Sequence, residues 1–252
     1  EEIATAWTAR NPAKKPARHS EKPLNKIRVL AWNIWNGGRE DGVEEGVERV
    51  IDVIRDSRAD IVAMQETYGS GPRIADGLGY YFYSRSSNLS LLSRFPICET
   101  HDLYDDSFRF GGATFALAPG QRLDVYSLWI HYLPDFCNDV RQPHANAAAL
   151  IAAEEQTRGH EIRDILKALS PRLRDKSRTV IVAGDFNSPS HLDWVPQART
   201  LHRDLVVEWP VSRTMAAAGF TDAYRQARPN PLTDPGRTWT PRSAESWQDR
   251  ID

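Results

Sequence analysis

The chain has 252 residues, of which 40% are hydrophobic, and its formal net charge at pH 7 is −2. This length and apolar content are enough for one folded domain with a substantial core, or for two at most. The small net charge excludes a general electrostatic attraction to nucleic acid, although a local basic groove remains compatible with it. No apolar run is long enough to cross a bilayer, so we expect no transmembrane segment. Separately, we expect the protein to be a monomer. The two cysteines, Cys98 and Cys137, leave the disulfide state and the compartment open, secreted and periplasmic locations included.

Residues 1–26 differ in composition from the rest of the chain. Basic side chains alternate there with prolines, and few apolar residues lie between them. We expect an N-terminal arm that is partly disordered, followed by one folded domain over residues 27–252. A basic arm can touch nucleic acid or an anionic surface, but a solvated leader explains the composition more simply.

The folded part begins with two apolar strands that flank an amphipathic helix. Residues 27–35 and 59–67 are apolar runs that each end on polar side chains. Between them, valine and isoleucine recur at helical spacing from about Gly42 to Ser57, with glutamates on the opposite face. This strand–helix–strand order is typical of an α/β protein.

Shorter segments with turn signals follow, which predicts an antiparallel region joined by hairpins. The expected strands are Tyr80–Ser84, Leu89–Leu92, Ile97–His101, Ala113–Leu117 and Leu123–Ile130. The later expected elements are a long helix over Ala145–Leu169 that Gly159 interrupts, a buried strand over 179–185, a helix over Val211–Ala218, a polar loop over Pro134–Pro143, and two late strands at Thr238–Thr240 and Gln248–Asp252.

Polar side chains stand where four of the apolar strands end. They are Asn33, Glu66, His131, and Asp185 with Asn187. Because side chains alternate along a strand, we expect Asp185 and Asn187 to point to the same side. A carboxylate such as Glu66 at the end of a buried strand needs a hydrogen-bond partner or a metal ion. The pattern therefore predicts a polar site built from strand ends.

Five short motifs carry a family resemblance. They are Trp32-Asn33, Gln65-Glu66, Leu92-Ser93-Arg94-Phe95-Pro96-Ile97, Gly184-Asp185-Phe186-Asn187 and Asp249-Arg250-Ile251-Asp252. In this order they resemble the endonuclease/exonuclease/phosphatase superfamily, which includes DNase I-like nucleases, abasic-site endonucleases, inositol polyphosphate 5-phosphatases and neutral sphingomyelinases. The resemblance covers roughly residues 27–252. It implies an α/β fold of four layers, with two mixed β-sheets packed face to face and helices outside.

The resemblance also implies a divalent metal, Mg²⁺ with Mn²⁺ as an alternative, and roles for the site residues. Glu66 matches the family's metal-binding glutamate, and Asn33 would offer its amide oxygen to the metal or to the phosphate. Asp185 matches the residue that helps to activate the attacking water. Asn187 would donate its amide hydrogens to the phosphoryl oxygens. His131 occupies a family histidine position and would donate a proton to the leaving oxygen.

Three further residues are expected to contact substrate. Tyr132 follows His131 directly, and abasic-site endonucleases carry a tyrosine at the His131 position. Trp35 lies beside the first motif, where an aromatic ring can stack on a sugar or a base. His191 lies close in sequence to Asp185. The other tryptophans, Trp194 and Trp209 among them, we assign to the core.

The chain departs from the family pattern at its C-terminus. Family members continue past the Arg-Ile-Asp strand to a Ser-Asp-His element, whose histidine contacts the scissile phosphate and is oriented by the aspartate that matches Asp252. We therefore expect a form truncated after Asp252, with substitution by His191 as the alternative. Truncation would leave a protein that binds metal and catalyses poorly.

These residues predict a Mg²⁺-dependent phosphoesterase. Its expected substrate is a phosphodiester or phosphomonoester of a small molecule or lipid head group. A DNase-like or abasic-site-type nuclease acting on nucleic acid is the alternative. A second alternative is a binding protein that keeps the fold and does not catalyse.

Overall fold

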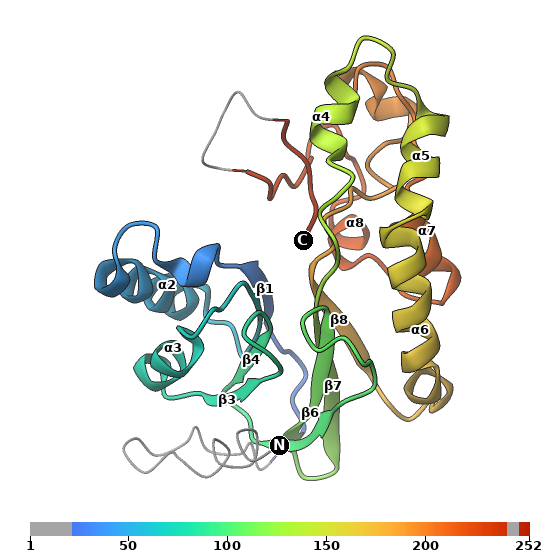
Figure 1. The fold of residues 1–252 in the computed structure, drawn as a ribbon. Helices are drawn as coiled ribbons and strands as arrows, with labels where there is room; N and C mark the ends of the chain where they lie inside the picture. The colour runs from blue at the N-terminus through green and yellow to red at the C-terminus, as the bar shows by residue number, and fades with distance from the viewer. Residues whose placement is uncertain (1–21, 241–246) are drawn as a thin grey trace. The chain divides into compact units, whose positions relative to one another are not determined.

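A computed structural model describes residues 22–240 and 247–252, so the expected arm at residues 1–21 lies outside the described residues. The chain forms two compact units (Figure 1). The described part of unit 1 comprises residues 22–129 and 169–185, and unit 2 comprises 130–168 and 186–252. In the described residues, no helix has the length and apolar content that a membrane span requires.

Unit 1 holds two four-stranded sheets, which confirms the expected α/β class with two mixed sheets. The first has the order β1 (Val29–Asn33), β2 (Ile61–Gln65), β4 (Ser90–Ser93) and β3 (Tyr81–Ser84). The second has the order β5 (Ile97–His101), β6 (Phe110–Ala118), β7 (Gln121–Trp129) and β8 (Val180–Asp185). The β1–β2 and β7–β8 pairs are parallel and the others are antiparallel.

The two sheets pack face to face, and β2 shows how the alternation of its side chains makes this possible. Ile61 and Ala63 pack in a core cluster with residues of β6 and β7 such as Phe115. Val62 and Met64, on the opposite face, pack in a second cluster with the first helices of the unit. All four of these β2 side chains are fully buried, as expected for a central strand covered on both sides.

Helices α2 (Val43–Ser57) and α3 (Gly71–Leu78) cover the outer face of the first sheet (Figure 1). The amphipathic pattern predicted α2 correctly. It did not predict α3, because that helix is short and contains Gly71 and Gly77, which have low helix propensity. Phe82 and Ile51 pack directly against these two glycines, so the helix is stabilised by its close approach to the sheet and to α2.

Unit 2 is mainly helical. Its elements are α4 (Phe136–Arg141), α5 (Ala147–Glu155), α6 (Arg158–Arg174), the 3₁₀ helix η2 (Pro196–Leu201), α7 (Pro210–Ala217) and α8 (Ala223–Ala227); the end of α6, from Leu169, belongs to unit 1. Its core is an apolar cluster around two fully buried tryptophans, Trp194 and Trp209. The assignment of these two tryptophans to the core is thereby confirmed.

Two expectations for the helical region need correction. The long helix over Ala145–Leu169 is two helices, and the break falls at Gln156 and Thr157 rather than at Gly159. The Thr157 hydroxyl donates to the carbonyl oxygens of Ala153 and Glu154, a local bond that competes with continuation of the helix. The expected polar loop over Pro134–Pro143 contains α4, whose Phe136 and Val140 are buried in the core of unit 2.

The expected strands at Thr238–Thr240 and Gln248–Asp252 are wrong as extended elements. Between these described segments there is one isolated antiparallel bridge, Trp239 with Asp249, and residues 241–246 lie outside the described residues. The last residues of the expected arm also have defined contacts, since the Leu24 backbone exchanges two hydrogen bonds of 2.8 and 2.9 Å with the Gln121 side chain. Cys98 and Cys137 are both free thiols.

Candidate active site

In unit 1, Asn33 joins two carboxylates that come from different strands. Asn33 ends β1, Glu66 follows β2, and Asp185 ends β8. The amide nitrogen Nδ2 of Asn33 donates to Glu66 Oε1 at 2.9 Å and to Asp185 Oδ2 at 3.0 Å. The structure thus brings together three of the predicted site residues, although 152 sequence positions separate Asn33 from Asp185.

The hydrogen bonds also fix the orientation of the Asn33 amide. Ionised carboxylates only accept hydrogen bonds, so the nitrogen must face Glu66 and Asp185. The amide oxygen accepts the backbone N–H of Trp35 at 2.9 Å. An amide oxygen has two lone pairs, so this hydrogen bond leaves the contact of Asn33 with a metal or a phosphate as a prediction.

The backbone of Glu66 adopts a left-handed conformation, with φ of 53°. Its N–H donates to Asn88 Oδ1 at 2.7 Å, and its carbonyl oxygen accepts from Gly37 N at 2.7 Å. Its carboxylate oxygen Oε2 accepts from Asn36 N at 3.1 Å, so the short 3₁₀ turn η1 (Asn36–Gly38) is fastened to Glu66. The sequence analysis missed Asn88, which is fully buried in the loop between β3 and β4; no local pattern distinguishes it from an ordinary turn asparagine.

Gly184 places Asp185 close against the neighbouring strand. A Cβ atom at Gly184 would lie 2.1 Å from the backbone oxygen of Leu128, and its φ of 153° lies outside the ordinary range for L residues. Asp185 itself is only 4% exposed. The strand ends there, and Asn187 has φ of 47°, so the expected strand alternation does not extend from Asp185 to Asn187.

Trp35 lies on the loop that follows Asn33. Its φ of 55° is unusual for a bulky residue, and 43% of its surface is exposed. The indole Nε1 donates to Glu40 Oε1 at 3.1 Å. Trp35 is therefore held both at its backbone N–H, which donates to Asn33, and at its indole nitrogen. The exposed indole therefore has a defined position on the loop that follows β1.

In unit 2, the contacts of His131 define the position of its proton. The backbone N–H of Leu133 donates to His131 Nδ1 at 3.0 Å, and Nδ1 also lies 3.3 Å from the carbonyl oxygen of Leu133. Because a backbone N–H can only donate, the shorter contact favours Nδ1 as acceptor, with the hydrogen of the neutral ring on Nε2. The His131 backbone N–H donates to Glu161 Oε2 at 2.8 Å. The ring stacks on Tyr132, with centroids 5.2 Å apart, and Tyr132 is 55% exposed.

The remaining predicted residues of unit 2 have separate surroundings. Asn187 Nδ2 donates to the carbonyl oxygen of Ile130 at 2.9 Å. Asp252 is half-buried, and its backbone N–H donates to Thr238 Oγ1 at 3.3 Å. His191 is buried with its Nδ1 2.9 Å from Ser212 Oγ, and burial lowers the pKa of its imidazole. The expected contact of His191 with substrate stays a prediction.

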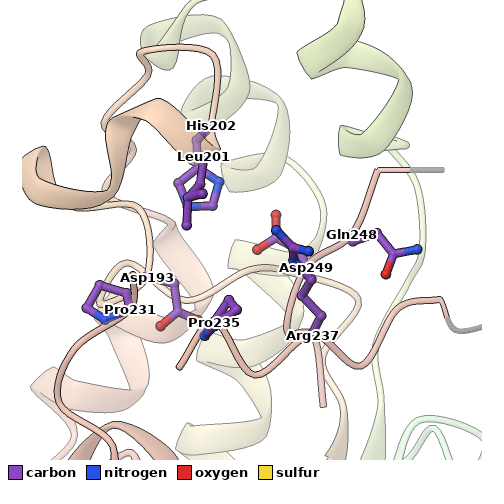
Figure 2. A pocket seen from close by; sticks show the side chains of 8 residues that line it. All are labelled: Asp193, Leu201, His202, Pro231, Pro235, Arg237, Gln248 and Asp249. Atoms are coloured by element: carbon purple, nitrogen blue, oxygen red, sulfur yellow. The ribbon is translucent and has the colours of Figure 1, made fainter. Parts of the chain in front are cut away.

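Unit 2 also contains a small polar cavity of about 10 Å³. Figure 2 shows its lining: Asp193, Leu201, His202, Pro231, Pro235, Arg237, Gln248 and Asp249. This volume has room for about one water molecule, so the cavity is too small for a substrate. Burial raises the pKa of Asp249 to about 7, although the indole nitrogens of Trp247 and Trp194 oppose this by donating to its carboxylate.

The donor atoms in unit 1 can be compared with what a divalent metal requires. In the described parts of the chain, no three or more His, Cys, Asp or Glu side chains gather into a ready-made metal cage. Mg²⁺ needs fewer protein ligands than such a cage provides, because it usually binds one or two carboxylates together with water and substrate oxygens. Glu66 and Asp185 supply hard oxygen donors linked through one amide, so the residues fit Mg²⁺ or Mn²⁺.

Two mixed sheets packed face to face, with polar side chains at the strand ends, define the DNase I-like class of α/β sandwich. The sequence model of the Endonuclease/Exonuclease/phosphatase family matches residues 30–252. The uncharacterized protein F14F9.5 of Caenorhabditis elegans is 30% identical over 228 residues, which are 86% of this chain and 71% of that protein. The chain therefore belongs to the Endonuclease/Exonuclease/phosphatase family, whose members are hydrolases that act on phosphate esters.

Two solved structures show the same fold at low sequence identity. D. rerio TDP2 complexed with single strand DNA product has a TM-score of 0.54 and 13% identity, and the match covers 91% of this chain and 82% of that one. The AP endonuclease from Archaeoglobus fulgidus has a TM-score of 0.52 and 17% identity, with 81% of this chain and 74% of that one covered. At these identities the likeness concerns the fold alone.

Proposed function

We propose that this protein is a divalent-metal-dependent phosphoesterase that hydrolyses a phosphodiester or phosphomonoester by attack of water. The observation that carries the proposal is the Asn33 amide, which holds the Glu66 and Asp185 carboxylates at strand ends. Two ionised acids repel each other, and a shared hydrogen-bond donor with a bound cation would offset that repulsion. Membership of a family of phosphate-ester hydrolases supports the same reaction class.

In unit 1 we assign three roles. Glu66 holds the metal, which, when bound, polarises the phosphoryl oxygen and neutralises charge that develops there. Asp185 accepts the proton of the attacking water as a carboxylate general base, while Asn33 Nδ2 holds its Oδ2 in place. Asn33 keeps both carboxylates in place through Nδ2, and its oxygen, which accepts from the Trp35 N–H, has a second lone pair for the metal or the phosphate.

In unit 2 the assignments follow from the matched motifs. His131 offers its Nε2–H to the leaving oxygen, because Leu133 occupies Nδ1. Asn187 donates an amide hydrogen to the phosphoryl oxygens, as its position in the Gly-Asp-Phe-Asn motif implies. The same motifs assign Asp252 to the catalytic residues, and Tyr132 contacts substrate with its exposed ring.

A nuclease is the second candidate function, and Trp35 favours it. An exposed indole on the loop that follows Asn33 can stack on a nucleobase. Both compared structures come from proteins whose names or contents concern DNA, namely an AP endonuclease and a TDP2 complex with single strand DNA product. An ester of a small molecule or lipid head group remains the alternative substrate, and a binding protein without catalysis remains the alternative function.

Hydrolysis of bis-p-nitrophenyl phosphate by the full natural chain, with Mg²⁺ or Mn²⁺ and with a chelator, tests the proposal. We expect metal-dependent turnover, and a loss of kcat of about 10²- to 10⁴-fold in Asp185→Asn, because the acceptor for the water proton is removed. Glu66→Gln should raise the metal concentration needed for half-maximal rate. Glu45→Gln, at an exposed position of α2, is the matched control and should behave as wild type.

Turnover that survives the chelator and Glu66→Gln would contradict the metal-dependent mechanism. A folded full-length protein that hydrolyses neither this ester nor an oligonucleotide, with either metal, would instead support the binding protein.

A further inference from the structure

Arg158, at the start of α6, is a fully buried cation that holds the loop carrying His131. Its Nη1 donates to three backbone carbonyl oxygens, those of His131 at 3.2 Å, Tyr132 at 3.1 Å and Pro134 at 3.0 Å. A buried carbonyl oxygen without a partner is costly, and a planar guanidinium can serve several at once. Arg158 therefore determines the shape of the 131–134 turn.

Glu154, in the last turn of α5, connects Arg158 to a second loop. One carboxylate oxygen, Oε2, accepts from Arg158 Nη2 at 3.4 Å, and both side chains are fully buried. The carboxylate also accepts from Ser188 Oγ at 2.9 and 3.0 Å, and from the backbone N–H of Val211 at 3.0 Å. Ser188 follows Asn187 directly, so one ion pair joins the His131 loop to the Asn187 loop within unit 2.

The shape of the 131–134 turn decides which nitrogen of His131 carries the proton. The Leu133 N–H lies 3.0 Å from Nδ1, and the carbonyl groups of Tyr132 and Pro134, on either side of Leu133, both accept from Arg158. The Leu133 N–H can only donate, so its shorter contact favours Nδ1 as acceptor over donation of an Nδ1–H to the Leu133 carbonyl oxygen 3.3 Å away, and this tautomer carries its hydrogen on Nε2.

We propose that Arg158, paired with Glu154, is a positioning residue that fixes the 131–134 turn and thereby keeps His131 in its Nε2–H form. Only the catalytic consequence of this inference rests on the proposed function, in which His131 donates its Nε2 proton to the leaving oxygen. The competing explanation is that the pair merely stabilises the fold. Replacing a whole buried ion pair by neutral groups is often neutral for stability, whereas removing one partner is not, and this difference makes the two explanations separable.

The test uses the full natural chain with the double substitution Glu154→Gln/Arg158→Met. The introduced amide oxygen can still accept from Ser188 and Val211, and no unpaired buried charge remains, so the variant should fold with a Tm closer to wild type than Arg158→Met alone. It cannot donate to the carbonyls of His131, Tyr132 and Pro134. The two explanations then differ in what happens to the histidine ring.

The first readout is the ¹⁵N spectrum of the His131 ring at a pH where imidazole is neutral, assigned by loss of its signals in His131→Gln. We expect the Nε2–H form in wild type and a mixture of both tautomers in the double variant. The second readout is turnover of bis-p-nitrophenyl phosphate, for which we expect kcat to fall about 10- to 100-fold with KM changed less than about threefold.

The pair Glu155 and Arg163 provides a matched control in the same two helices. It has the same residue types and forms an ion pair, but its side chains are 47% (Arg163) and 43% (Glu155) exposed, whereas those of Glu154 and Arg158 are fully buried. Glu155→Gln/Arg163→Met should leave the tautomer and kcat unchanged. A wild-type tautomer in the folded Glu154→Gln/Arg158→Met variant would overturn the inference. If the tautomer mixes as expected but His131→Gln retains full activity, the positioning role stands and the proposed role of His131 fails.

Discussion

Glu66 is held in a conformation that a glutamate does not adopt by itself. A left-handed backbone costs an L residue roughly 1–2 kcal/mol. Three contacts offset this cost: Asn88 accepts the Glu66 N–H, Gly37 donates to its carbonyl oxygen, and Asn36 donates to its carboxylate. Such strain persists only where several contacts hold it, and it is concentrated at functional sites. The position of the Glu66 carboxylate is therefore set by its neighbours rather than by the strand that precedes it.

Trp35 provides a test of substrate class at the level of a single residue. If its exposed indole stacks on a base, Trp35→Ala should raise KM for oligothymidylate by about 5- to 150-fold, the equivalent of 1–3 kcal/mol of stacking. Trp35→Phe should show a smaller increase. Steady-state kinetics on oligothymidylate and on a base-free phosphodiester of similar length would measure the effect. An equal increase for both substrates would rule out base stacking, and Val43→Ala, at an exposed position, serves as control.

Among the elements, β8 depends on a close approach to β7 at its last residues. The two strands are parallel, and Leu128 pairs with Gly184 while Trp129 pairs with Asp185. Only a residue without a Cβ fits at Gly184, since the backbone oxygen of Leu128 occupies the place that a Cβ would take. The glycine in the Gly-Asp-Phe-Asn motif is therefore required by strand packing, one position before the acid.

Gly184→Ala should consequently destabilise the protein by at least about 2 kcal/mol, because overpacking adds to an unfavourable φ. Gly120→Ala separates these two causes, because Gly120 has a positive φ of 74° but open space around it. Its substitution should lower the free energy of unfolding by about 1–2 kcal/mol, from the unfavourable φ alone. Urea denaturation of both variants measures the difference. Equal losses at the two positions would show that the contact with Leu128 is relieved by a small backbone shift.

At the scale of the whole molecule, stability should depend on pH through Asp249, which is 3% exposed. Its folded pKa is raised to about 7, above the unfolded value of about 3.9, so the folded state holds the proton more tightly. The stability that this provides is complete below about pH 4 and is lost as the pH rises through 7. The neutral Asp249→Asn variant should therefore gain about 2–3 kcal/mol relative to wild type between pH 5 and pH 8.

Chemical denaturation of wild type and Asp249→Asn at several pH values would measure this difference. Asp56→Asn, at an exposed position of α2, controls for the loss of a charge and should show a constant difference from wild type. If the free energies of unfolding of Asp249→Asn and wild type also differed by the same amount at every pH, the buried carboxyl would titrate in the ordinary range.

Metal binding should also register as stability of the whole protein. A ligand that binds only the folded state at ten times its Kd adds about 1.4 kcal/mol, so Mg²⁺ or Mn²⁺ should raise Tm. NaCl at equal ionic strength should not, and a chelator should reverse the effect. Glu66→Gln should lose most of the shift. An identical shift in wild type and Glu66→Gln would place the metal elsewhere.

The parts of the fold that local sequence specifies were predicted well. β2 and α2 follow from the period of their apolar residues, and β5 occupies the predicted residues. The helix break at Thr157, the short helices α3 and α4, and the absence of extended strands at Thr238 and Gln248 were not predicted. Each depends on a competing local hydrogen bond or on packing against a distant element, which periodicity does not report.

The sequence by itself determined the order of the elements, the family, and the polar residues that end the strands, because these depend on short motifs and on local periodicity. Only the tertiary structure decided what those residues contact. Asn33 bridges Glu66 and Asp185, Asn88 holds the Glu66 backbone, and Arg158 shapes the His131 turn. These partners are distant in the sequence, from 22 positions for Glu66 and Asn88 to 152 for Asn33 and Asp185. The physical reason is that a hydrogen bond depends on distance and direction in space, and a one-dimensional pattern contains neither.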